Sequence, residues 1–199
     1  ETGVARRQVD MEEYRHSLER IYGRTHMVMR KYREQARRFP KRVVLPESDN
    51  EKILRACQIL ADEHIARPVL LGDVERLTSQ IKAMGLDLAG RVEIINNLSS
   101  PQLEQYAQEY TRLRQRRGIT LREAMDRLQS RKYFAMMMLR QGEADAVVLG
   151  MTTHYPESVS PALEIVGLRE GVKRLAGMYM IVLKNDLAFF ADCTVNVDP

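Results

Sequence analysis

The sequence lacks most of the short motifs that would assign a chemistry directly. It contains no CxxC, no HExxH, no GxxxxGK[ST] and no GxGxxG after a strand, so zinc, P-loop and dinucleotide chemistry have no motif to support them. The four histidines are scattered, and no metal site is expected. Tryptophan is absent, and the two cysteines, Cys57 and Cys193, lie in apolar stretches. This pattern predicts reduced thiols in a cytoplasmic protein rather than disulfides or a nucleophile.

Long hydrophobic runs are also missing. No stretch of 18 or more apolar residues occurs, so neither a membrane-spanning helix nor a membrane partner is expected. The first residues, ETGVARRQVD, lack both an initiator Met and the apolar core of a secretion signal. We therefore expect a soluble piece of a longer protein, consistent with 44% hydrophobic and 29% charged residues among 199.

The net charge of +4 comes with a cluster of Arg and Lys in the first 42 residues. A nucleic-acid surface is one interpretation of that cluster. The basic residues alternate, however, with apolar ones at helical spacing: Tyr14, Leu18, Ile21, Tyr22, Met29 and Tyr32. This spacing favours a solvated helix face opposite a packed stripe, and no nucleic-acid partner is expected.

The order of the remaining segments predicts an α/β fold. Residues 10–39 read as one long helix, with Asp10 as its N-cap and Pro40 as its end. Buried strands are expected at 42–47, 67–72, 91–97 and 145–150. Because these runs are continuously apolar, they predict a mostly parallel sheet covered on both faces. The expected helices are 49–65, 100–117 with Pro101 in the first turn, 120–141 split at Ser130 and Arg131, and one beginning near Ala162.

After Gly171 the pattern changes. Two apolar runs joined at Lys184-Asn185-Asp186 predict a β-hairpin. A hairpin after strand–helix units indicates the start of a second subdomain. No helix follows it before Pro199, so we expect that subdomain to be incomplete.

Several stretches together resemble phosphate acetyltransferases, in order and with similar spacing over residues 40–199. They are KRVVLPESDNEKILRACQIL, ARPVLLGD, LRQRRGITLREAMDRL, YFAMMMLRQGEADAVVLGMTT, SPALEIVG and LAFFADCTVNVDP. The segments GVARRQVD and YRHSLERIYGRTHMVMR resemble the join in hybrid NADP-dependent malic enzymes, where a phosphotransacetylase-like domain follows the malic enzyme domain. The resemblance implies a linker helix in 1–40, a first α/β subdomain in 41–150 and the start of a second in 151–199.

The resemblance also implies a function. It indicates a doubly wound sheet of the phosphotransacetylase/isocitrate-dehydrogenase-like type. Acetyl-CoA or a related acyl-CoA would bind as a regulatory ligand in the cleft between the two subdomains. The protein would form a homo-oligomer. NADP and a divalent metal would belong to the malic enzyme domain, which this sequence lacks. The catalytic serine-arginine loop and aspartate of active family members would lie beyond Pro199, so no catalytic residue is expected here.

The loop after the fourth expected strand departs from the active pattern. Active phosphotransacetylases carry small hydroxyl residues there and an arginine before Pro-Ala, a set that can cradle phosphate. The matching positions are Thr153, His154, Tyr155, Pro156 and, for the arginine, Ser160. We expect the rings to fill the space, and Pro156 removes an amide donor. Loss of an arginine–phosphate contact costs about 1.5–3 kcal/mol, which predicts poor phosphate turnover.

Such a loop could still hold an acyl-CoA. The candidate binding residues are Arg114, Thr152, Thr153, His154, Tyr155 and Ser160. Arg114 matches an arginine that the family uses near the CoA or phosphate site, but it could equally be a solvated charge at a helix end. For His154 and Tyr155 a surface role is the favoured alternative. Glu143, Asp145 and Asp192 are expected to act structurally at strand ends.

Three functions remain open from the sequence. The favoured one is a non-catalytic, acetyl-CoA-sensing and oligomer-forming domain of a malic enzyme. The second is an active phosphate acetyltransferase. The third is a structural module without a small ligand, in which the long helix and the hairpin form subunit contacts.

Overall fold

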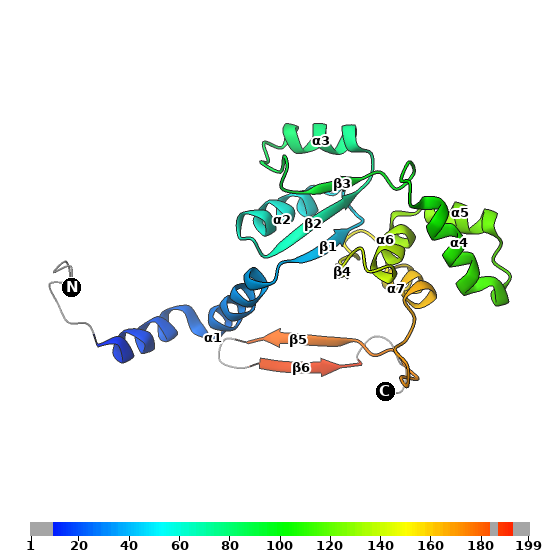
Figure 1. Ribbon diagram of the computed structural model, residues 1–199. Coiled ribbons are helices and arrows are strands. Elements are labelled where there is room, and N and C mark those ends of the chain that lie inside the picture. The colour runs from blue at the N-terminus through cyan, green and yellow to red at the C-terminus, as the bar shows by residue number, and fades with distance from the viewer. Residues whose placement is uncertain (1–9, 184–186, 193–199) are drawn as a thin grey trace. The chain divides into compact units, whose positions relative to one another are not determined.

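The computed structural model describes residues 10–183 and 187–192, without the side chains of residues 17–26 (Figure 1). The chain divides into two units, one of residues 36–170 and one of residues 1–35 and 171–199. The first unit contains the sheet and most of the helices, and the second contains most of the long helix and the hairpin.

The unit of residues 36–170 is built on a four-stranded parallel sheet with strand order β3-β2-β1-β4. The strands are β1 Lys41–Leu45, β2 Ala66–Leu71, β3 Glu93–Ile95 and β4 Ala146–Val147. The predicted parallel sheet is thus confirmed. β4 is shorter than expected because the chain turns away soon after the amide of Val148 bonds to the carbonyl of Val44 at 3.0 Å.

Helices cover both faces of this sheet, as its apolar strands predict. They are α2 Glu51–Asp62, α3 Val74–Ala83, α4 Leu103–Arg114, α5 Leu121–Leu128, α6 Arg131–Arg140 and α7 Tyr155–Ile165, with a short 3-10 turn at Gln115–Arg117. Successive strand residues point to opposite faces. Leu45 and Leu70 therefore join one buried cluster with α2 and α3, whereas Val44, Val69 and Leu71 join the other with α4 to α7.

The local signals at the helix ends act as their residue types predict. Thr120 and Glu123 form a reciprocal capping box at the start of α5. The expected break at Ser130 separates α5 from α6. Asn50 caps α2. Two residues earlier, the fully buried hydroxyl of Ser48 donates to the carbonyl of Leu45 and accepts from the amide of Leu71. Ser48 therefore ties the ends of β1 and β2 together.

Two helix starts differ from the expectation. α7 begins at Tyr155 rather than near Ala162. Pro156 fits this earlier start because a first-turn residue has no helical partner for its amide, and the helix continues through the buried Pro161. Pro101 lies in the turn before α4, which begins at Leu103.

The long helix α1 spans Met11–Arg38. Its predicted N-cap is confirmed, since Asp10 Oδ1 accepts the amides of Glu12 at 2.8 Å and Glu13 at 3.2 Å. The stripe residues Leu18, Ile21 and Tyr22 fall among the side chains outside the described set. No helix in the described part of the chain combines the length and apolar character needed to cross a membrane.

The hairpin pairs β5 Met178–Val182 with β6 Leu187–Ala191 in antiparallel register, as predicted. The expected turn, residues 184–186, lies outside the described residues. Pairing of Tyr179 with Phe190 and of Met180 with Phe189 places large apolar side chains on both faces. All four are more than one-third exposed within the structure. An isolated two-stranded hairpin is at best marginally stable in water.

Candidate functional site

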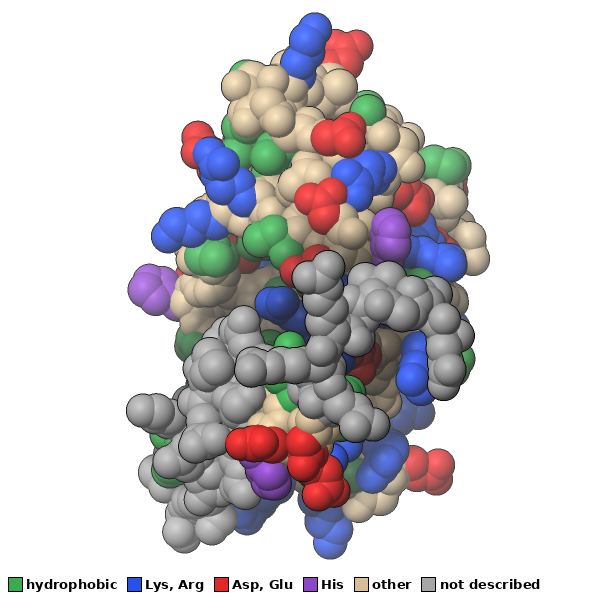
Figure 2. Space-filling model, turned by 90° about the vertical axis from the view of Figure 1, so that its left-hand side faces the viewer, with side chains coloured by type: hydrophobic (Ala, Val, Ile, Leu, Met, Phe, Trp, Pro, Cys, Tyr) green, Lys and Arg blue, Asp and Glu red, His purple; other side chains and the backbone are tan. Residues whose placement is uncertain are grey.

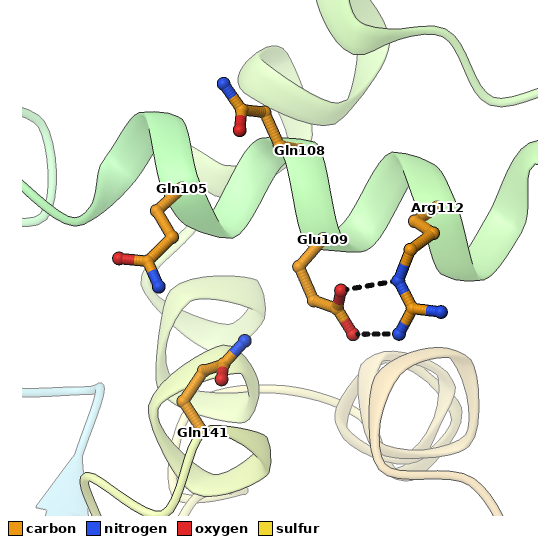
Figure 3. Close-up of a pocket in the computed structure, with 5 residues that line it drawn as sticks. All are labelled: Gln105, Gln108, Glu109, Arg112 and Gln141. Carbon is orange, nitrogen blue, oxygen red and sulfur yellow. Dashed lines mark hydrogen bonds and ion pairs between the residues drawn. The ribbon is translucent and has the colours of Figure 1, made fainter.

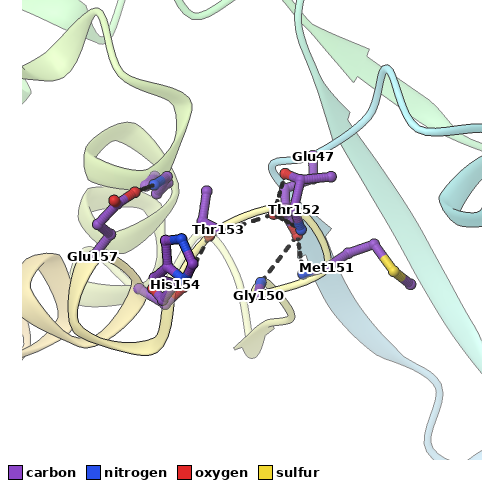
Figure 4. Close-up of polar contacts among 9 residues, drawn as sticks. Glu47, Gly150, Met151, Thr152, Thr153, His154 and Glu157 are labelled. Carbon is purple, nitrogen blue, oxygen red and sulfur yellow. Dashed lines mark hydrogen bonds and ion pairs between the residues drawn. The ribbon is translucent and has the colours of Figure 1, made fainter.

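The loop of residues 150–154 joins β4 to α7 at the carboxyl end of the parallel strands, where α/β sheets place their ligands (Figure 4). The segment after β1 ends beside it, because β1 and β4 are paired neighbours. Glu47, two residues beyond β1, reaches this loop. The two strand ends together therefore form the site.

The carboxylate of Glu47 binds the loop's backbone. Its Oε2 accepts the amides of Gly150 at 2.9 Å and Met151 at 2.8 Å. Its Oε1 accepts the amide and the hydroxyl of Thr152 at 2.8 and 2.6 Å (Figure 4). The hydroxyl of Thr153 lies 3.5 Å from the same oxygen and 3.0 Å from the hydroxyl of Ser158 on α7. Three successive amides that point at an anion are thus occupied by a carboxylate of the chain itself.

This arrangement favours the ionised form of Glu47. Partial burial acts to raise the pKa of the carboxyl group, but the hydrogen bonds from Thr152, Met151 and Gly150 outweigh it and hold the pKa below its ordinary value. The loop and the carboxylate therefore stabilise each other at neutral pH.

A pocket of about 280 Å³ opens beside this loop. Its lining comes from the segment after β1, the start of α6 and the loop: Pro46, Glu47, Asp49, Asn50, Ser130, Arg131, Lys132, Thr152 and Thr153. Both lining cations are paired, Arg131 with Asp49 at 2.7 Å and Lys132 with Glu157 at 3.4 Å. The pocket lining thus contains two cations, Arg131 and Lys132, and two carboxylates, Glu47 and Asp49. A third carboxylate, that of Glu157, lies outside the lining and pairs with Lys132.

Arg131 has little room to move. A Cβ atom at Gly72 would approach its guanidinium to 2.9 Å, and the φ of +147° at Gly72 also favours glycine. The close approach of the Gly72 backbone and the ion pair with Asp49 hold the guanidinium in place. Glu47 and Arg131 were not singled out from the sequence. Glu47 could have been found, since it follows a predicted strand at the edge where ligands bind.

The predicted site residues are divided between two places. Thr152 and Thr153 line the pocket. His154 occupies the N-cap position of α7 without a side-chain capping bond, Tyr155 follows it, and Ser160 lies further along the helix. All three are exposed and outside the pocket lining. The two rings, which were expected to fill the phosphate space, therefore lie outside the lining of this pocket. The loop amides are bound instead by the carboxylate of Glu47.

Pro156 occupies the second position of α7, where it removes an amide that the first turn would otherwise offer to a ligand, as expected. Arg114 ends α4. Its Nε is buried and has no hydrogen-bond partner among the described residues, and none of their hydrogen bonds or ion pairs joins it to the loop. An unsatisfied buried donor of this kind is costly. The role of Arg114 at a ligand site stays a prediction, and a charge at a helix end remains its alternative.

The expected structural carboxylate at the start of β4 is confirmed. Asp145 accepts the amide of Arg42 at 2.8 Å and the ammonium of Lys41 at 3.0 Å, and these contacts lower its pKa. Cys57 is fully buried, and burial raises the pKa of its thiol to about 12, which leaves little thiolate at neutral pH. The described residues contain no group of three or more His, Cys, Asp or Glu that could hold a metal ion.

A second pocket, of about 460 Å³, lies between α4 and the end of α6 (Figure 3). Its lining is Gln105, Gln108, Glu109, Arg112 and Gln141. Glu109 and Arg112 hold each other through two hydrogen bonds of 2.8 Å. The pocket contains none of the predicted site residues, and its one acid and one base neutralise each other. The face in Figure 2 likewise shows basic and acidic side chains interspersed.

Comparison with known proteins agrees with this architecture. The model of the phosphate acetyl/butaryl transferase family matches residues 27–199. The chain is 36% identical to the phosphate acetyltransferase of Nitratidesulfovibrio vulgaris over 166 residues, which are 83% of this chain and 23% of that protein. It is 35% identical to the NADP-dependent malic enzyme of Escherichia coli over 203 residues, which are 100% of this chain and 27% of that enzyme.

Two solved structures share the fold. EutD phosphotransacetylase from Staphylococcus aureus superposes with a TM-score of 0.78, at 26% identity over 86% of this chain and 52% of that one. A phosphotransacetylase from Streptococcus pyogenes gives 0.81, at 26% identity over 87% and 53%. The chain thus spans about half the length of these structures and about a quarter of the length of the two curated relatives named above.

The alignments also separate two kinds of relative. Those to the phosphate acetyltransferases of Nitratidesulfovibrio and Synechocystis cover 83% and 80% of the chain, whereas those to the malic enzymes of Escherichia coli and Haemophilus influenzae cover all of it. The resemblance noted in the sequence is confirmed in both parts. The chain belongs to the phosphate acetyl/butaryl transferase family, in the form that NADP-dependent malic enzymes carry in their C-terminal region.

Proposed function

We propose that this chain is a non-catalytic, acetyl-CoA-sensing and oligomer-forming domain of an NADP-dependent malic enzyme. In this proposal a separate domain oxidatively decarboxylates malate to pyruvate and binds NADP and the divalent metal. The whole-chain similarity to malic enzymes supports the parent protein. The charge balance of the pocket beside the loop is the observation that carries the non-catalytic role.

Inorganic phosphate is doubly charged near neutral pH and needs cations or free amides. Here the three loop amides already bind Glu47. Arg131 and Lys132 are paired with carboxylates, and Ser160 stands where active family members are expected to have arginine. A phosphate in this pocket would have to displace a carboxylate and lie close to it, and like charges at about 4 Å repel by roughly 4 kcal/mol at a partly shielded protein surface.

Acyl-CoA binding does not require phosphate to enter that pocket. The hydroxyl of Thr153 can donate a hydrogen bond to a neutral carbonyl. The guanidinium of Arg114, which ends α4 and is only partly buried, can donate to a CoA phosphate. Both groups can act without any proton transfer. This combination fits a domain that binds an acyl-CoA but does not catalyse its conversion.

Two assays on the full-length protein test the proposal. Calorimetric titration with acetyl-CoA should show binding, and an assay for acetyl phosphate from acetyl-CoA and phosphate should show no turnover above background. Arg114→Gln should weaken binding by roughly tenfold, the effect of one charge-assisted contact. Arg122→Gln, an exposed arginine on α5, serves as the control and should bind as wild type. Absence of binding at millimolar acetyl-CoA would remove the sensing role.

An active phosphate acetyltransferase is the second candidate, because relatives bearing that name share four-fifths of the chain. It predicts acetyl phosphate formation that falls when the loop is changed. Turnover by the full-length protein that is lost in Thr153→Val would replace the sensing proposal with this one.

The exposed hairpin supports the oligomer-forming part of the proposal. Met178 is 68% and Phe189 58% exposed within the structure. A homo-oligomer of a cytoplasmic enzyme would give these side chains a covering surface. Light scattering of Phe189→Glu in the full-length protein should show a smaller particle; an unchanged mass would count against the hairpin as a subunit contact, as in the structural-module alternative.

A further inference from the structure

One carboxylate on α7 collects hydrogen-bond donors from three other helices. Glu164 Oε2 accepts from the hydroxyl of Tyr110 on α4 at 2.5 Å and from Arg127 on α5 at 2.9 Å. The hydroxyl of Tyr133 on α6 lies 3.4 Å from the same oxygen. Arg127 also donates to the hydroxyl of Tyr110 at 2.9 Å. These four residues form the Glu164 cluster.

The cluster is well shielded from solvent. Tyr110 is fully buried, and the side chain of Glu164 is 21% exposed. Burial, followed by the hydrogen bond to Glu164, raises the pKa of Tyr110 far above its ordinary value, so its hydroxyl stays a donor. Charged hydrogen bonds in such surroundings are among the stronger ones that a protein makes.

The two helices that Glu164 joins are those that carry the predicted ligand contacts. α7 begins directly after the loop with Thr152 and Thr153. On α4, Arg114 follows Tyr110 by four residues, so the two lie on the same helix face, one turn apart. Figure 1 shows α7 close to α6, with α4 and α5 on the same side of the sheet. The Glu164–Tyr110 bond therefore links α7, which follows the loop, to α4, which carries Arg114.

We propose that Glu164 is a positioning residue that fixes the ligand loop of residues 150–154 relative to Arg114. The proposal rests on the proposed acyl-CoA function for its ligand, though not for its effect on the loop. Glu47 anchors the loop from the sheet side. Glu164 anchors the following helix about 15 Å further on, at 1.5 Å per residue from His154 at the end of the loop to Glu164. A loop held at both ends can keep the hydroxyls of Thr152 and Thr153 at a fixed distance from Arg114.

Two measurements on the full-length protein test this role in Glu164→Gln. The first is hydrogen exchange of residues 150–154, followed by mass spectrometry. The second is the affinity for acetyl-CoA. The matched control is Glu109→Gln: Glu109 has the same 21% side-chain exposure, but its arginine partners, Arg112 and Arg140, lie on α4 and α6. Tyr110→Phe provides a milder variant that removes one donor, in case Glu164→Gln does not fold.

We expect faster loop exchange and roughly tenfold weaker acetyl-CoA binding in Glu164→Gln, with both quantities near wild type in Glu109→Gln. Arg114→Gln should then cost less affinity in the Glu164→Gln background than in wild type, since Arg114 would already be misplaced. A purely structural Glu164 would lower the melting temperature and leave loop exchange and affinity unchanged, and that result overturns the proposal. If wild type binds no acetyl-CoA while Glu164→Gln still loosens the loop, the acyl-CoA function fails and the positioning role stands.

Discussion

The sheet-containing unit of residues 36–170 and the hairpin of β5 and β6 use the same kinds of apolar side chain in opposite ways. In the sheet unit, Leu54, Leu70 and Phe134 are at most 1% exposed. In the hairpin, Met178 and Phe189 are more than half exposed. The difference teaches that one region buries its apolar side chains in a core of its own, while the other leaves them exposed within the structure.

The two regions also differ in their polar contacts. The sheet unit contains a hydrogen-bond network around Glu164 and holds the loop of residues 150–154 through Glu47. The described hairpin residues are joined mainly by the backbone ladder between the strands. Changes in the sheet unit should therefore alter stability and ligand binding, and changes in the hairpin should alter association.

The largest expected difference comes from core truncation. Leu54→Ala should lower the free energy of unfolding by about 2–5 kcal/mol, because it leaves a cavity against β1 and α3. Phe189→Ala in the hairpin should stay within about 0.5 kcal/mol at concentrations where the chain is monomeric. Urea unfolding checks both. Equal losses in the two variants would mean that Phe189 is buried in the protein's own fold.

A smaller difference is expected for matched tyrosine changes. Tyr110→Phe removes a hydrogen bond to the Glu164 carboxylate and should cost about 1.5–3 kcal/mol. Tyr179→Phe, at a 49% exposed hairpin position, should cost less than about 0.5 kcal/mol. Thermal unfolding monitored by circular dichroism compares them, and a neutral Tyr110→Phe would show that the network contributes little.

Helix capping within the sheet unit gives a finer test. Thr120→Ala removes the capping box of α5 and should cost about 1 kcal/mol. Thr78→Ala, at an exposed position inside α3, should be neutral or slightly stabilising, since alanine is the better helix former. The same urea titration measures both. A loss at Thr78 as large as at Thr120 would contradict the capping explanation.

The smallest effect is local and depends on pH. Because the folded pKa of Glu47 lies below its ordinary value of about 4.3, its contribution to stability is complete above that value and is lost as pH falls through the folded pKa. The amide resonances of Gly150, Met151 and Thr152 should titrate together with the Glu47 carboxyl group in NMR spectra. Glu47→Gln should abolish that common transition; its persistence in the variant would assign it to another group.

Much of this protein could be determined from the sequence by itself. Continuous apolar runs predicted the parallel sheet and its coverage on both faces, since a strand buried on two sides has no polar positions. Asp10, Thr120 with Glu123, and the break at Ser130 act within a few residues of themselves, so their consequences could be predicted locally. Short matched stretches identified the family.

Only the tertiary structure decided the site. Glu47 is 103 residues from Gly150 in sequence and 2.9 Å from its amide, because β1 and β4 are paired neighbours. Glu164 meets Tyr110, Arg127 and Tyr133 because four helices pack on one face of the sheet. Ionic and hydrogen-bonding contacts act over a few ångströms, and the sheet order and helix packing decide which distant residues come that close.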